Sequence, residues 1–309
     1  MKARTTETAV VAEPEVQAPS RDGTAIAIAS LVGAATIWGT ATIGTKSALD
    51  TYPPFILASV RWMIALSVMT PTLLLRGGKP ILDRRTALLG LCGITLFNLF
   101  FNFGLQRTSA ANGSLISGAL PVVIAFFAFL LFRERLGPIA VVGIALSIAG
   151  IVATVLGDSL DASLSGNLLI FGSVIVWALF SIYSRHYMQG EDAMAATMGT
   201  AVWGLLFMLP FAGQEFVTGD IAWPSLKVAA VVVYLGLGPS MAGILLWSFG
   251  LTRIPATQAG VFSNLTPIVG IAAAGIVLSE PITRYHIVGT ILVLSGVLLT
   301  TWSRSRSLR

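Results

Sequence analysis

Residues 103–150, FGLQRTSAANGSLISGALPVVIAFFAFLLFRERLGPIAVVGIALSIAG, return 146 positions later as residues 249–296, FGLTRIPATQAGVFSNLTPIVGIAAAGIVLSEPITRYHIVGTILVLSG. The two copies align without a gap and share a proline, a glutamate and two glycines, at Pro121/Pro267, Glu134/Glu280, Gly143/Gly289 and Gly150/Gly296. A repeat of this length is too long for a solenoid unit and fits a duplicated half-protein. In membrane proteins, such a pair of halves is typical of transporters, with the binding site between them.

The composition predicts a polytopic membrane protein. The chain is 55% hydrophobic and 11% charged, against about 25% charged in soluble domains. The 14 Asp and Glu residues avoid the middle of every apolar run. The net charge of +5 comes from Lys and Arg spread singly through short loops, which is a topology signal rather than a nucleic-acid patch. The single cysteine, Cys92, gives no disulfide framework, and we expect neither a metal nor a cofactor.

Ten segments reach the roughly 20 apolar residues that cross a bilayer. They are residues 24–45, 54–75, 86–106, 109–132, 138–157, 167–187, 194–213, 226–249, 256–278 and 284–302. Because backbone groups in lipid must bond to one another, runs of this length are helices. The predicted fold is an all-α integral membrane protein with ten transmembrane helices. Residues 1–23 are expected to form a flexible cytoplasmic tail, and residues 303–309 a basic one.

The distribution of charge predicts that both termini are cytoplasmic. With that orientation most Lys and Arg residues lie inside, and only Lys46, Arg107, Lys227 and Arg284 fall in outside segments. The halves 24–157 and 167–302 each contain five predicted spans. Because five is odd, the second half must be inverted relative to the first.

Three groups of residues carry a family resemblance. They are Trp38-Gly39 with Pro53-Pro54 and Arg61-Trp62, then Ala110…Pro121…Glu134 with Ala256…Pro267…Glu280, and then Gly143…Gly150 with Gly289…Gly296. With these features, residues 24–302 resemble the EamA family of the drug/metabolite transporter superfamily. The resemblance implies an exporter or facilitator of amino acids or other small metabolites in the bacterial inner membrane.

Two prolines at the middle of repeat-related spans mark a candidate pathway. Each proline frees the carbonyl four residues earlier, on Ser117 for Pro121 and on Ser263 for Pro267. Interrupted helices at matching positions indicate a transporter binding site. We therefore expect the turns 117–121 and 263–267 to line the central pathway; the alternative is a pair of packing kinks.

Arg61 is the only charged residue well inside a predicted span. Charges buried in membranes are costly and are commonly functional. Arg61 could bind a substrate carboxylate, or it could bind helix-end carbonyls as a structural clamp.

Other polar and aromatic residues within the spans are weaker candidates. The amides of Asn98, Asn102 and Asn264 could face the substrate or join helices. Trp38, Trp177 and Tyr234 could form an aromatic wall, or belong to the interfacial belt. We expect the helix-end residues Glu134 and Glu280 to pair with a nearby Arg or to cap the following helix.

The residues that the spans lack narrow the substrate class. A proton-coupled drug exporter, which is the alternative, would need a membrane-embedded carboxylate, and phosphate exchange would need several buried cations. An intramembrane enzyme would need a nucleophile with a base, or a metal cluster. A non-transporting receptor would have no need of two symmetric proline breaks. The sequence therefore favours alternating-access transport of a small neutral or zwitterionic metabolite, by a monomer or homodimer whose partners are this solute and the lipid bilayer.

Overall fold

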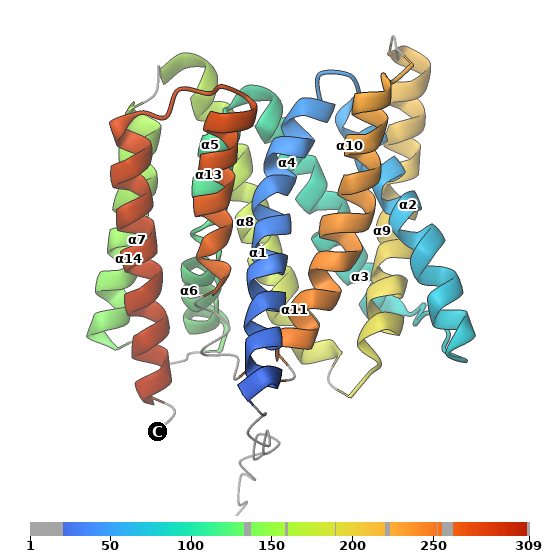
Figure 1. Ribbon diagram of the computed structural model, residues 1–309, viewed down its shortest axis with the longest axis horizontal. Coiled ribbons are helices and arrows are strands. Elements are labelled where there is room, and N and C mark those ends of the chain that lie inside the picture. Colours follow the sequence, from blue (N-terminus) through green and yellow to red (C-terminus); the bar gives the residue numbers. More distant parts are fainter. Residues whose placement is uncertain are drawn as a thin grey trace, which may run out of the picture.

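The computed structural model describes residues 21–132, 137–157, 160–188, 190–219, 223–251, 253–254 and 262–307. Within these ranges every regular element is a helix, which confirms the all-α prediction (Figure 1). Residues 1–20 of the predicted N-terminal tail, and Glu134 and Ala256, lie outside the described part. The first helix begins at Arg21 and the last continues to Ser307, so each takes in part of a predicted tail.

The first half contains the five predicted crossings, two of which are built from more than one element. In chain order the elements are α1 (Arg21–Ala48), α2 (Pro54–Leu75), α3 (Arg84–Gly90), the π-helix η1 (Leu91–Leu96), α4 (Phe97–Arg107), α5 (Ala110–Ser117), α6 (Leu120–Phe132) and α7 (Pro138–Gly157). The α3–η1–α4 run is one continuous span, and α5 and α6 form a fourth crossing that bends by 41°.

The second half repeats this order. Its elements are α8 (Leu160–Tyr187), α9 (Ala193–Thr218), α10 (Leu226–Leu237), the π-helix η2 (Gly238–Ala242), α11 (Gly243–Leu251), α13 (Leu265–Val277) and α14 (Arg284–Ser307). Among the described residues, eight helices are long and apolar enough to cross a membrane, or nine with the bent α5–α6 pair. The ninth predicted span, 256–278, is represented by the 13 residues of α13, because residues 255–261 lie outside the described ranges.

Close packing of α7 against α14 confirms that the second half is inverted. A β-carbon added at Gly143 would lie 2.6 Å from the carbonyl oxygen of Gly296, and one at Gly150 would lie 2.7 Å from that of Gly289. The contacts on α14 therefore descend as those on α7 ascend, so these two repeat-related helices are antiparallel. Small residues permit this approach of backbones in membranes.

A hydrogen bond marks the axis that relates the two halves. The Ser147 hydroxyl donates to the Val293 carbonyl over 3.2 Å, and these two residues occupy the same position of the repeat. A residue that contacts its own repeat mate must lie at the two-fold axis. The repeat mates α2 and α9 also pack together, on the side opposite to α7 and α14 (Figure 1).

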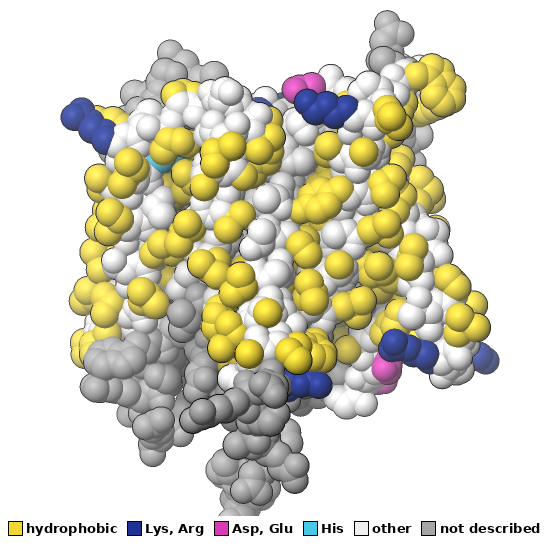
Figure 2. Space-filling view, in the orientation of Figure 1, with side chains coloured by type: hydrophobic (Ala, Val, Ile, Leu, Met, Phe, Trp, Pro, Cys, Tyr) yellow, Lys and Arg dark blue, Asp and Glu magenta, His cyan; other side chains and the backbone are white. Residues whose placement is uncertain are grey.

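The surface has the layered polarity of a membrane protein. The start of α1 and the end of α14 lie at one edge of the molecule, here called the terminal edge (Figure 1). In Figure 2, hydrophobic side chains cover the face between this edge and the opposite edge, and the visible Lys and Arg side chains gather towards the two edges. An apolar band between two charged rims is what a bilayer requires of its solute.

Candidate functional site

Both predicted proline turns are helix interruptions in the structure. In the first half the helix ends at Ser117 and resumes at Leu120, and in the second half Asn264 interrupts the helix just before α13. Asn264 is the repeat mate of Gly118, so the breaks occupy equivalent positions. Pro121 and Pro267 both fall in the first turn of the resumed helix, where a missing N–H leaves no bond unmade.

The two interruptions meet in the fold. A β-carbon at Gly118 would lie 2.9 Å from Cγ of Pro267, which places one break directly against the other. Ser117, Pro121, Ser263 and Asn264 are all partly exposed, whereas Pro267 is buried. The Ser117 hydroxyl donates to the Gly113 carbonyl over 2.7 Å. The structure thus brings the predicted turns together at the contact between the halves.

Two π-helical segments, which the sequence analysis missed, also occupy matching positions of the repeat. Residues 91–96 form η1, and their mates 237–242 contain η2. A π-helical turn leaves carbonyls outside the usual ladder and is frequent at functional sites. Side chains bond to them: Asn98 Nδ2 donates to the Ile94 carbonyl over 2.7 Å, and Trp38 Nε1 to the Pro239 carbonyl over 3.1 Å. The Gly238-Pro239 pair within an apolar run was an available signal for η2; η1 has none.

Arg61 lies two turns into α2 and contacts η2. Its Nε donates to the Ser240 hydroxyl over 2.8 Å, and that hydroxyl donates in turn to the Leu235 carbonyl over 3.0 Å. The guanidinium carbon is 6.0 Å from the ring centre of Trp62. In the described part of the chain, the structure gives the two terminal nitrogens of Arg61 no hydrogen-bond acceptor and Arg61 no carboxylate partner.

The aromatic candidates lie in two repeat-related clusters rather than in one wall. Trp38 packs on Trp247 with ring centres 5.5 Å apart, beside η2. Tyr234 belongs to the same side, because its hydroxyl lies 2.6 Å from that of Thr40 on α1. Trp177, the repeat mate of Trp38, lies between Phe97 and Phe180 at 4.8 and 4.9 Å, beside η1.

The two repeat-related regions differ in polarity. Beside η2 lie Arg61, Tyr234 and Ser240, whereas their repeat mates beside η1 are Thr200, Leu88 and Ile94. The fold is therefore symmetric in its backbone, and a cation with its hydroxyl partner occurs in only one of the two positions.

The two asparagines of α4 are buried and bond to backbone. Asn98 and Asn102 are 2% and 1% exposed. Asn98 bonds within its own helix, and Asn102 Nδ2 donates to the Pro54 carbonyl at the start of α2 over 3.0 Å. The carbonyl oxygens of both amides have no partner in the described structure.

The opposite edge is closed by contacts between elements far apart in the chain. The Glu280 carboxylate accepts hydrogen bonds from the backbone N–H groups of Ala110 and Ala111 over 2.8 and 2.9 Å. The expectation that Glu280 pairs with an Arg or caps the following helix is therefore wrong: it caps α5, in the other half. Its repeat mate Glu134 lies outside the described residues.

Other side chains at the opposite edge act in the same way. Glu215 accepts from the N–H groups of Phe55 and Ile56 at the start of α2, over 2.9 and 3.0 Å. The buried His286 of α14 lies 3.0 Å from the amide oxygen of Asn112 in α5. These bonds join the two halves at one edge.

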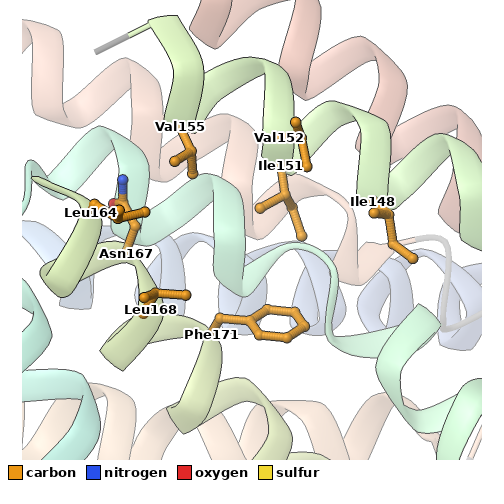
Figure 3. A pocket seen from close by; sticks show the side chains of 8 residues that line it. All are labelled: Ile148, Ile151, Val152, Val155, Leu164, Asn167, Leu168 and Phe171. Atoms are coloured by element: carbon orange, nitrogen blue, oxygen red, sulfur yellow. The ribbon is translucent and has the colours of Figure 1, made fainter. Parts of the chain in front are cut away.

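Two surface grooves of the described structure are apolar, and the second of them borders η1. One of about 270 Å³ runs between α7 and α8, and Figure 3 shows the side chains that line it: Ile148, Ile151, Val152, Val155, Leu164, Asn167, Leu168 and Phe171. Leu168 is 63% exposed on this outer surface. A second, of about 380 Å³, is lined by Phe55, Leu91, Thr95, Leu96, Leu99, Phe207 and Phe211. Both linings are almost wholly apolar, so neither groove suits a polar solute. No cluster of metal-ligating side chains occurs among the described residues.

Inverted helical halves, with interrupted helices meeting between them, define a class of membrane transport proteins. Comparison with known sequences agrees with this. The sequence model of the EamA-like transporter family matches residues 25–156 and 164–302, one match for each half. The chain belongs to the EamA-like transporter family, which indicates transport rather than catalysis.

Curated relatives cover nearly the whole chain. The uncharacterized transporter YetK of Bacillus subtilis is 28% identical over 284 residues, which cover 89% of this chain and 86% of YetK. The probable amino-acid metabolite efflux pump of Salmonella typhimurium is 26% identical over 285 residues, covering 86% and 91%. Its namesake in Escherichia coli is 26% identical over 286 residues, with the same coverage.

A solved crystal structure has the same fold. It superposes with a TM-score of 0.64 over 94% of this chain and 100% of its own, at 21% sequence identity. At this identity the likeness concerns the fold alone.

Proposed function

We propose that this protein exports, or facilitates the diffusion of, small neutral or zwitterionic metabolites, foremost amino acids with apolar side chains. The observation that carries the proposal is the meeting of the two helix interruptions, Gly118 against Pro267, between inverted halves. The names of the Salmonella and Escherichia relatives support amino acids as the first solutes to test.

The composition of the spans supports this substrate class. Arg61 is a single cation, which suits one carboxylate and is too little for a phosphate dianion. Within the described spans the only carboxylate is that of Glu215, which lies near the end of α9 and caps backbone N–H groups of α2. A cationic drug exchanging for protons would need a carboxylate at mid-membrane instead.

Alternating access follows from the inverted repeat. The bonds from Glu280 and His286 hold the halves together at the opposite edge, so the described state is closed there. In an inverted-repeat transporter, the two halves rock so that closure passes from one edge to the other around a fixed site. In this proposal the closed edge faces outward, and both termini lie on the cytoplasmic side of the inner membrane. The excess of Lys and Arg at the terminal edge favours this orientation.

Flux into proteoliposomes tests the proposal. Purified protein in vesicles is expected to speed the movement of at least one of leucine, phenylalanine and methionine by at least about tenfold over protein-free vesicles. The variant Gly118→Val tests the contact between the interruptions, because its added methyl groups press on Pro267. We expect it to lower that flux by about tenfold. If none of the amino acids in a full panel moves faster than through protein-free vesicles, the proposed substrate class is wrong.

A further inference from the structure

Arg61 is a cation for which the described part of the protein supplies no anion. It lies within a membrane span, away from either end of α2, and its one hydrogen bond in the described structure joins it to the neutral hydroxyl of Ser240. A guanidinium in such a place is costly unless it is paired. The missing charge must therefore come from outside the described chain, and a transported solute can supply it.

The hydrogen bond from Arg61 to Ser240 leaves the two terminal nitrogens of the guanidinium without an acceptor in the described structure. It uses Nε, so the terminal nitrogens Nη1 and Nη2 remain as donors. Two parallel N–H groups of this kind fit the two oxygens of a carboxylate. The Ser240 hydroxyl donates its proton to the Leu235 carbonyl and accepts the hydrogen bond from Arg61 Nε. This bond orients the guanidinium and therefore its two terminal nitrogens.

The residue of η2 next to Ser240 is in contact with an aromatic cluster. Pro239, next to Ser240, accepts from Trp38 Nε1, and Trp38 packs on Trp247. Arg61 and Trp38 therefore hold adjacent residues of one π-helical segment. An anion-binding group beside two indole rings matches an amino acid that has an apolar side chain.

The repeat-related position in the first half lacks this chemistry. The mates of Arg61 and Ser240 are Thr200 and Ile94, and neither can hold a carboxylate as an ion pair. This asymmetry indicates that an anion-binding subsite occurs in only one of the two repeat-related positions.

We propose that Arg61, oriented by Ser240 of η2, binds the carboxylate of the transported solute. This inference rests on the proposed transport function and names the chemical group that the site recognises. The α-amino group and the side chain of the solute then lie outside this subsite.

Paired probes that differ only in the carboxylate test the subsite. Binding of leucine, phenylalanine and methionine to the purified full-length protein is compared with binding of leucinamide, phenylalaninamide and methioninamide by calorimetry. The wild type is expected to prefer at least one acid over its amide by at least about tenfold, the range for a charge-assisted hydrogen bond. Arg61→Gln is expected to abolish this preference, and Arg61→Lys to keep part of it, because a lysine cannot form the bidentate pair. Thr200→Val, at the repeat-related position, is the matched control and should retain the full preference.

The outcomes separate this inference from the proposed function. A wild type with no acid preference, including one that binds none of the six probes, overturns the subsite, as does a folded Arg61→Gln variant that keeps the preference. If Arg61→Gln does not fold, Ser240→Ala and Arg61→Lys decide: both must weaken the preference by at least about threefold, and unchanged values overturn it. Acid-selective binding without flux would support the subsite and refute transport. Equal flux of acids and amides would support transport and refute the subsite.

Discussion

Replacing Gly143 by valine is expected to disrupt the packing of α7 against α14 and to destabilise the whole protein. A β-carbon at this position lies against the Gly296 carbonyl at 2.6 Å and the Thr300 nitrogen at 2.9 Å, which are backbone atoms and cannot rotate away. Overpacking typically costs about 1–3 kcal/mol, and more where no side chain can yield. Each kcal/mol lowers the melting temperature by about 2–4 °C in proteins of about 150–250 residues. We therefore expect a decrease of about 5 °C or more, measured on detergent-purified protein.

The two-fold axis places a second, equivalent glycine contact between α7 and α14, so a second substitution adds to this destabilisation. Gly150 approaches Gly289 as Gly143 approaches Gly296, so Gly143→Val combined with Gly150→Val should give no monodisperse protein. The control is Gly213→Val, because a β-carbon there meets nothing within 4 Å and the position lies in α9. Equal melting temperatures for Gly143→Val and Gly213→Val would contradict the close packing of these two helices.

Replacing Glu280 by alanine is expected to open the opposite edge and to slow transport by at least about tenfold. The substitution removes two hydrogen bonds from one carboxylate to the start of α5, in the other half. Hydrogen bonds to charged groups contribute about 1.5–3 kcal/mol each, so the balance between closed and open states shifts by an order of magnitude or more. The same carboxylate also favours the helix N-terminus through the helix dipole.

A cysteine next to the lost bonds reports the opening. In a Cys92→Ser background, Ala111→Cys should react with a membrane-impermeant maleimide at least about tenfold faster when Glu280 is alanine. Glu191→Ala serves as the control, because Glu191 is exposed and its hydrogen bond in the described structure comes from its backbone N–H rather than its carboxylate. If transport and labelling match the wild type in the Glu280→Ala protein, the cap does not hold this edge closed.

The parts of the fold that repeat in the sequence were predictable, because a duplicated sequence carries its geometry with it. The odd number of spans predicted the inversion, which the antiparallel contacts of Gly143 with Gly296 and of Gly150 with Gly289 confirm. Pro121 and Pro267 predicted interruptions at the right positions, since a ring nitrogen cannot donate a hydrogen bond.

The features that the sequence could not predict depend on packing between halves. Glu280 looks like a local cap in the sequence, yet its partners are 170 and 169 residues away. The segment η1 carries no proline and reads as ordinary apolar helix, so its π-helical turn arises from its surroundings. Trp38 and Trp177 are equivalent in the repeat, and only the fold shows that they lie in separate clusters.

We propose that the solute passes between the halves, at the place where the two interruptions meet. The most direct measurement is the labelling of Ser117→Cys, in the Cys92→Ser background, by a membrane-impermeant thiol reagent in right-side-out and in inside-out vesicles. Because only an ionised thiol reacts, a cysteine in a watered pathway is labelled and one facing lipid is not. The control, Phe126→Cys on the exposed face of α6, should stay unlabelled. We expect the cysteine at position 117 to react from both sides and a transported amino acid to slow the reaction. A cysteine at position 117 that reacts from neither side, with or without that amino acid, would contradict this proposal.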